Sequence, residues 1–168
     1  PVRIRDVLSL EPDSYHIVLH GVVRARGTVK AGRELAINPG SVYGKLEGTP
    51  TREPAFGLEA VWIDPGQRDM ARTLGYTVVD AATAIATHMN KVLRDSAAEL
   101  LSHDETQKLL DKLAVRHPKL VEELVPGKLP LGVVTRTLQN LLTEGVPIRD
   151  MRTVAEALLE ASARTQDP

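Results

Sequence analysis

The sequence predicts an α+β fold in which a β-rich part is followed by a part made only of helices. Three observations carry this prediction. The first third of the 168-residue chain contains short alternating apolar runs that are separated by Gly and Pro. The middle has a strand–helix–strand pattern. Beyond about residue 100, apolar residues recur every three or four positions, which is the spacing of amphipathic helices.

Strands and turns are expected over the first 54 residues. The pattern predicts strands at residues 2–5, 15–19, 22–26 and 34–37. His20 and Gly21 lie between the second and third of these strands and predict a hairpin. Asn-Pro-Gly at 38–40 ends the fourth strand. Residues 39–54 are rich in Gly, Pro, Ser and Thr, which predicts an ordered loop around one short strand.

The middle of the chain predicts a β-α-β unit with a further helix after it. The expected strands are residues 60–63 and 76–79, and the expected helices are residues 65–74 and 81–93. Asp64 and Asp80 directly precede these helices and can cap them, and Pro65 suits a first helical position. Gly75 marks the end of the first helix.

The last third predicts helices alone. Apolar stripes place helices after residue 102, at 119–125, and around 131–142 and 148–159. Ser102 and Glu105 have the spacing of a capping box, and Pro118 ends the helix that they begin. The change from strands to helices near residue 100 is the clearest subdomain boundary in the sequence.

Composition and charge indicate a globular protein without a strong electrostatic field. The chain is 42% hydrophobic and 26% charged, and its formal net charge is −1. Residues 101–168 hold nine Lys/Arg and ten Asp/Glu, so no basic face for a nucleic-acid partner is expected. No apolar stretch reaches the roughly 18 residues of a membrane span. Because position 1 is Pro rather than Met, we expect a piece of a longer protein.

No pattern in the sequence predicts a metal site, a cofactor or an enzyme. The chain has no Cys, which excludes disulfides and thiolate ligands. His16 and His20 would lie about 13 Å apart on one face of a strand, too far to share a metal ion. His88, His103 and His117 have no ligand partner at a suitable spacing. There is neither a nucleophile elbow nor a Gly-rich phosphate loop.

The only Phe and the only Trp of the chain both lie within residues 53–63. Aromatic side chains anchor either a core or a docking surface. Trp62 lies in a predicted strand, so we expect it to pack in the core. Taken from the residues alone, a core position is also the favoured interpretation of Phe56. The alternative is an exposed apolar groove formed by Phe56, Leu58, Ile37 and Pro39.

Several segments resemble the FlhA family of bacterial flagellar export-gate proteins, which are homologous to the export gates of type III secretion injectisomes. They are VRIRD at 2–6, AINPG at 36–40, PTREPAFGL at 50–58, AVWI at 60–63, GYTVVD at 75–80, ATH at 86–88, LQNLL at 138–142 and VPIRDMRT at 146–153. These segments follow the family order over essentially the whole chain. The forms at 36–40 and 138–142 are more similar to flagellar than to injectisome members.

The resemblance implies a layout and a location. It implies that residues 1–31 and 81–100 form part of a first subdomain, that residues 32–80 form a β-α-β subdomain inserted into it, and that residues 101–168 form a helical third subdomain. The full-length protein would be a bacterial inner-membrane protein with this region on the cytoplasmic side, not embedded in the membrane. It would assemble as a homo-nonameric ring and contact other components of the export apparatus.

The resemblance also implies a docking site for flagellar export chaperones that carry their substrates. Matched motif by motif, this site consists of Ile37, Pro39, Glu53, Phe56, Leu58, Val79, Ala84 and Thr87. Glu53 and Ala84 stand where the family commonly has Asp and Val. The expected function is therefore a docking platform without enzymatic activity or cofactors. The alternative is the equivalent domain of an injectisome.

Overall fold

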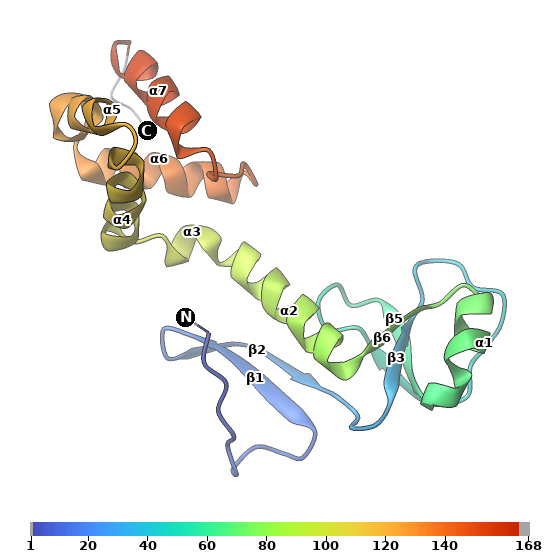
Figure 1. Cartoon of the computed structure of the whole chain (residues 1–168). Coiled ribbons are helices and arrows are strands. Elements are labelled where there is room, and N and C mark those ends of the chain that lie inside the picture. Colours follow the sequence, from blue (N-terminus) through green and yellow to red (C-terminus); the bar gives the residue numbers. More distant parts are fainter. Residues whose placement is uncertain (1, 165–168) are drawn as a thin grey trace. The chain divides into compact units, whose positions relative to one another are not determined.

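A computed structural model describes residues 2–164 and divides into two units, one ending at Leu93 and one beginning at Arg94 (Figure 1). The first unit contains every strand of the described chain, and the second contains only helices. The predicted α+β class is therefore confirmed. Each unit has a hydrophobic core of its own.

The first unit begins with the predicted hairpin. Strands β1 (Ser14–Leu19) and β2 (Val22–Thr28) pair antiparallel. The connecting residues His20 and Gly21 both have positive φ, at 50° and 81°. Two consecutive residues of this kind make a turn whose twist matches that of the flanking strands. The register shifts between Ile17 and Val18, so the hairpin carries a β-bulge.

A four-stranded antiparallel sheet forms the centre of the first unit. Its strands are β3 (Glu34–Ile37), β4 (Thr49–Arg52), β5 (Glu59–Ile63) and β6 (Thr77–Asp80), in the order β4-β5-β3-β6. The predicted β-α-β unit is present, but β3 lies between its two strands and pairs with both. The short strand expected within residues 39–54 is β4.

Helices cover both faces of this sheet (Figure 1). Successive side chains of a strand point to opposite sides, so each strand can contribute to the packing on both faces. On one face, Leu35, Ala60 and Trp62 pack against Ala84 of helix α2 (Ala81–Asp95). On the other face, Ala36 and Ile63 pack against Ala71 of helix α1 (Arg68–Thr73). We call these the α2 face and the α1 face. Trp62 is 3% exposed, which confirms its expected core position.

The two predicted acidic caps are present. The Asp64 side chain accepts a hydrogen bond from the Gly66 N–H and begins a 3₁₀ turn, η1 (Pro65–Gln67), that leads into α1. The Asp80 carboxylate accepts one from the Thr83 N–H at 2.7 Å at the start of α2. These bonds satisfy helix N–H groups that have no partner within the helix. The hydrogen bonds from Thr83 also lower the pKa of the Asp80 carboxyl, because they stabilise its charged form.

The strand expected at residues 2–5 is wrong. This segment has no regular secondary structure, and the side chains of Val2 and Ile4 are 65% and 94% exposed. Alternation of apolar and polar residues is only half of what a strand requires. It also needs a neighbouring strand to pair with its N–H and C=O groups, and no strand of the described residues pairs with this segment.

The second unit is a bundle of short helices. They are α3 (Ala97–Leu100), α4 (His103–Ala114), α5 (Pro118–Glu122), the π-helical turn η2 (Glu123–Lys128), α6 (Leu131–Thr143) and α7 (Met151–Ser162). The core combines residues from most of them: Leu101, Leu110, Leu113, Leu124, Leu129, Val134, Leu138, Met151 and Ala155. The apolar stripes of the sequence therefore identified the buried faces of α4, α6 and α7.

Two details of the second unit differ from expectation. The Ser102 hydroxyl accepts from the Glu105 N–H at 3.3 Å as predicted, but the Glu105 side chain pairs with Lys108 instead of closing the box. The helix expected over residues 119–125 gives way to η2 at Glu123, where Val125 is extended and Leu129 N–H donates to the Leu124 carbonyl.

The predicted change of structure near residue 100 lies close to the division between the units. That division falls earlier, after Leu93, because α3 packs against α6 and the Gln139 side chain donates to the Leu101 carbonyl at 2.8 Å. The finer layout, with residues 1–31 and 81–100 as one subdomain, 32–80 as another and 101–168 as a third, stays a prediction.

Replacement of Trp62 by Ala should destabilise the first unit by about 3–5 kcal/mol, because it removes a large buried side chain and leaves a cavity. Urea denaturation followed by circular dichroism measures this loss. The matched control is Val115→Ala, since that side chain is 83% exposed, and a change within about 0.5 kcal/mol is expected there. A loss below about 1 kcal/mol for Trp62→Ala would contradict the core position.

Candidate functional site

The centre of the site is the connection between β4 and β5, residues 53–58, which we call the Phe56 turn. Glu53 N–H donates to the Leu58 carbonyl and Gly57 N–H donates to the Glu53 carbonyl, both at 2.8 Å. Gly57 has φ of 71°, a conformation that side chains with a Cβ rarely adopt. The backbone at both ends of the turn is thus hydrogen-bonded, and Phe56 and Gly57 at its tip are exposed.

The Glu53 carboxylate holds this turn from within. One of its oxygens accepts from the Ala55 N–H and the other from the Phe56 N–H, each at 2.8 Å. Hydrogen bonds to a charged acceptor are stronger than those between neutral groups. Glu53 is only 3% exposed. Both carboxylate oxygens of this member of the implied docking site are thus bound to their own turn.

Phe56 is exposed. The fraction of its surface open to solvent is 63%, and that of Leu58 is 40%. The core position that the residues alone favoured for Phe56 is therefore wrong. The reason is local: the amides of the turn bind Glu53 beneath them, so the chain bends with Phe56 on the outside. Arg52 adds a second restraint, since its guanidinium donates to the Gly57 carbonyl at 2.9 Å.

The Asn-Pro-Gly turn lies beside this surface. Asn38 N–H donates to the Glu59 carbonyl at 2.8 Å, next to the end of the Phe56 turn. The Asn38 side chain accepts from the Gly40 N–H at 2.9 Å, which closes the turn. Pro39 between them is exposed. The exposed members of the predicted site, Pro39, Phe56 and Leu58, thus come from two neighbouring turns.

The other predicted members lie below that surface. Ile37 and Val79 are half-buried and pack against the α2-face cluster. Ala84 is 3% exposed and belongs to the cluster itself. Thr87 is half-buried on α2, and its hydroxyl donates to the Thr83 carbonyl at 2.9 Å. Ala84 can therefore act as support for the site, and Ile37, Val79 and Thr87 can form its partly accessible edge.

A polar pair that is influenced by the charge of Glu53 was not predicted. The Tyr15 hydroxyl and the His88 Nδ1 are 2.8 Å apart, and the two rings meet edge to face with centroids at 5.8 Å. His88 is 6% exposed. The two residues are 73 positions apart. No sequence periodicity relates a strand residue to a helix residue at that separation, so the pair could be found only from the structure.

Burial and the nearby carboxylate shift the pKa values of this pair. Burial raises the pKa of the Tyr15 phenol to about 12, and the negative charge of Glu53 adds to the increase. Burial lowers the pKa of His88, while the Glu53 charge opposes this shift. Tyr15 is therefore a neutral hydroxyl and His88 a neutral imidazole at neutral pH. Tyr15, Glu53 and His88 together form what we call the polar cluster.

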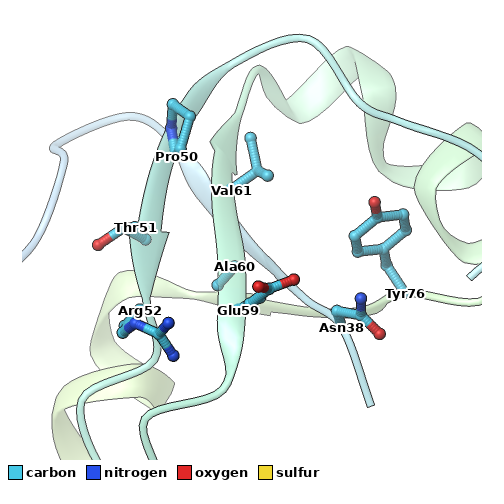
Figure 2. A pocket seen from close by; sticks show the side chains of 8 residues that line it. All are labelled: Asn38, Pro50, Thr51, Arg52, Glu59, Ala60, Val61 and Tyr76. Atoms are coloured by element: carbon cyan, nitrogen blue, oxygen red, sulfur yellow. The ribbon is translucent and has the colours of Figure 1, made fainter. Parts of the chain in front are cut away.

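A cavity of about 280 Å³ lies beside strands β4 and β5 (Figure 2). It is lined by Asn38, Pro50, Thr51, Arg52, Glu59, Ala60, Val61 and Tyr76. Val61 and Tyr76 belong to the α1-face packing. Arg52 and Asn38 also line the cavity and lie next to the Phe56 turn and in the Asn-Pro-Gly turn. The Tyr76 hydroxyl donates to the Gly44 carbonyl at 3.0 Å. None of the eight predicted site residues lines it.

Within residues 2–164, no three His, Asp or Glu side chains lie close enough to bind one metal ion. No helix in that described part has the length and apolar character needed to cross a membrane. We call the exposed residues Pro39, Phe56 and Leu58 the Phe56 surface. This surface offers an aromatic ring and neighbouring apolar side chains on a restrained turn. That arrangement suits the binding of another apolar surface.

Comparison with known proteins finds relatives in bacteria. The model of the FHIPEP family matches residues 1–168. The chain is 52% identical over 167 residues to the flagellar biosynthesis protein FlhA of Proteus mirabilis and 48% identical to that of Escherichia coli (strain K12). Each match covers 99% of this chain and 24% of the relative. The chain thus spans about a quarter of the length of these relatives.

Solved structures share the fold. One is the structure of the Chlamydia pneumoniae CdsV and CdsO protein complex, where the match covers 96% of this chain and 50% of the solved chain, with a TM-score of 0.83 and 24% identity. Another is nonameric EPEC SctV-C, where the match covers 95% of this chain and 48% of the solved chain, with a TM-score of 0.69 and 22% identity. At this identity the likeness establishes the fold alone.

The lowered pKa of His88 predicts a pH-dependent stability. Folding favours the neutral imidazole, so this contribution is fully present above the ordinary His pKa of about 6.5 and is lost as the pH falls below it toward the lowered pKa. Unfolding free energies at pH 5, 6 and 7 should rise with pH, and more steeply for wild type than for His88→Asn. A folded-state NMR titration that gives His88 a pKa above about 6.5 would contradict the shift.

Proposed function

The chain belongs to the FHIPEP family, and from this premise we propose that it is a docking platform of the flagellar protein export gate. It binds export chaperones that carry their substrates, and it does so at the Phe56 turn and the neighbouring Asn-Pro-Gly turn. One observation carries the proposal above all others: the only Phe of the chain is 63% exposed on a turn that is fixed by a buried carboxylate.

The chemistry of this surface supports docking and not catalysis. A partner that buries Phe56 and Leu58 removes apolar surface from water, which is the main favourable term in association. Aromatic residues at the centre of an interface commonly dominate its binding energy. Because the turn is already hydrogen-bonded, little conformational entropy is lost when it is covered.

Polar contacts then come from the edge of the surface. The Thr87 hydroxyl donates within its helix and retains the capacity to accept a hydrogen bond from a partner. The predicted eight-residue site becomes a surface with three kinds of member. Pro39, Phe56 and Leu58 contact the partner first, Ile37, Val79 and Thr87 border the contact, and Glu53 and Ala84 hold it from below.

The wider context of the proposal comes from the family and the shared fold. The full-length protein would lie in the bacterial inner membrane with this region on the cytoplasmic side. A homo-nonameric ring is supported by the fold shared with nonameric EPEC SctV-C. Contact with further export components is supported by the fold shared with CdsV in its complex with CdsO.

The equivalent domain of an injectisome is the second candidate. SctV-C and CdsV, two solved structures with this fold that represent injectisome export gates, are 22% and 24% identical to the chain. The flagellar FlhA relatives are up to 52% identical to it. This difference favours the flagellar role.

Phe56→Ala should leave the fold intact and weaken chaperone binding by about 2 kcal/mol or more, because an exposed ring that anchors the interface is removed. Calorimetric titration of the 168-residue chain with a substrate-loaded flagellar chaperone measures the loss. Tyr43→Ala is the matched control, since that ring is 87% exposed and lies outside the site. If Phe56→Ala binds as tightly as wild type, the proposed site is wrong.

A further inference from the structure

We propose that Tyr15 and His88 are positioning residues for the Phe56 turn: they keep the buried carboxylate of Glu53 available to the amides of the turn, so that a partner meets Phe56 already in place. The inference rests on the proposed docking function and names what prepares that surface. Neither residue lies among the eight predicted to contact a chaperone.

The members of the polar cluster come from three separate parts of the first unit. Tyr15 comes from β1, Glu53 from the connection between β4 and β5, and His88 from α2. Glu53 and His88 are 3% and 6% exposed, so they have little access to water. Buried polar groups must satisfy one another, because each unmade hydrogen bond is costly there.

Tyr15 and His88 form a hydrogen bond with each other, and Glu53 forms its hydrogen bonds with the turn. The Tyr15 hydroxyl and the His88 Nδ1 satisfy each other at 2.8 Å. That leaves both oxygens of Glu53 for the N–H groups of Ala55 and Phe56. A neutral imidazole can carry its proton on either ring nitrogen. Without the hydroxyl, Nδ1 loses its partner, and a proton placed there would be drawn to the nearby Glu53 charge in competition with the turn.

The hairpin fixes where the Tyr15 hydroxyl lies. Tyr15 is paired with Gly27 across the strands, and a Cβ at position 27 would collide with the Tyr15 ring. The ring therefore lies over the bare glycine backbone. In this position its hydroxyl reaches His88 of α2, and the negative charge of Glu53 acts on both side chains.

The expected consequence is a loss of preorganisation without a loss of contact. If the Glu53 bonds to the turn weaken, Phe56 samples more conformations and a partner must order it on binding. Removing one hydrogen bond of the cluster should then speed amide exchange at Ala55 and Phe56 and weaken chaperone binding, each roughly threefold to tenfold.

The test compares four variants of the full chain: Tyr15→Phe, His88→Asn, Tyr76→Phe and Phe56→Ala. Amide exchange at Ala55 and Phe56 is measured by NMR, and affinity is measured with a substrate-loaded flagellar chaperone. Tyr15→Phe should show both effects. His88→Asn should stay within about twofold of wild type, because the Asn carboxamide offers an acceptor in place of Nδ1.

Tyr76→Phe is the matched control. It also removes a half-buried phenol hydroxyl that donates a hydrogen bond, but on the α1 face. Exchange at Ala55 and Phe56 should not change in this variant. If Tyr15→Phe leaves both readouts as in wild type, or if Tyr76→Phe changes them equally, the positioning inference is wrong.

Phe56→Ala separates this inference from the proposed function. Should Phe56→Ala keep full affinity while Tyr15→Phe still speeds exchange in the turn, docking at Phe56 fails and the positioning of the turn is supported. Should Phe56→Ala abolish binding while Tyr15→Phe changes neither readout, docking is supported and the positioning inference is overturned.

Discussion

The Phe56 surface depends on one buried carboxylate. The Glu53 carboxylate accepts hydrogen bonds from the N–H groups of Ala55 and Phe56. The Glu53 backbone closes the turn through hydrogen bonds with Leu58 and Gly57. A charged group costs much to bury unless hydrogen bonds stabilise it, so these bonds and the burial of Glu53 require each other. An aromatic ring can stay exposed here because the backbone that carries it is held from the inside.

The sheet supplies the foundation for this arrangement. Trp62 and Leu35 fill the α2 face, and Ile63 with Ala36 fills the α1 face. The two turns at residues 38–40 and 53–58 lie next to each other at one end of these strands. The Glu34 carboxylate, which is paired with Arg68, helps to hold α1 on its face, and this pairing lowers the Glu34 pKa.

Local patterns predicted most of the fold, and contacts distant in sequence account for what they missed. The hairpin, the strand of Trp62, the acidic caps and the helical stripes follow from spacing within a few residues. Residues 2–5 have the alternation of a strand but no neighbour to pair with. Composition favoured a buried Phe56, and only the family resemblance reversed that. Tyr15 and His88 meet across 73 positions, and no local pattern can express that contact.

We propose that a substrate-loaded export chaperone docks on the Phe56 surface of this chain. The most direct measurement is an NMR titration of the isotope-labelled 168-residue chain with such a complex. We expect the signals of Phe56, Leu58 and Thr87 and of Gly40 in the neighbouring turn to change most. Changes confined to the α1-face cavity or to the helical unit from Arg94 on would contradict it.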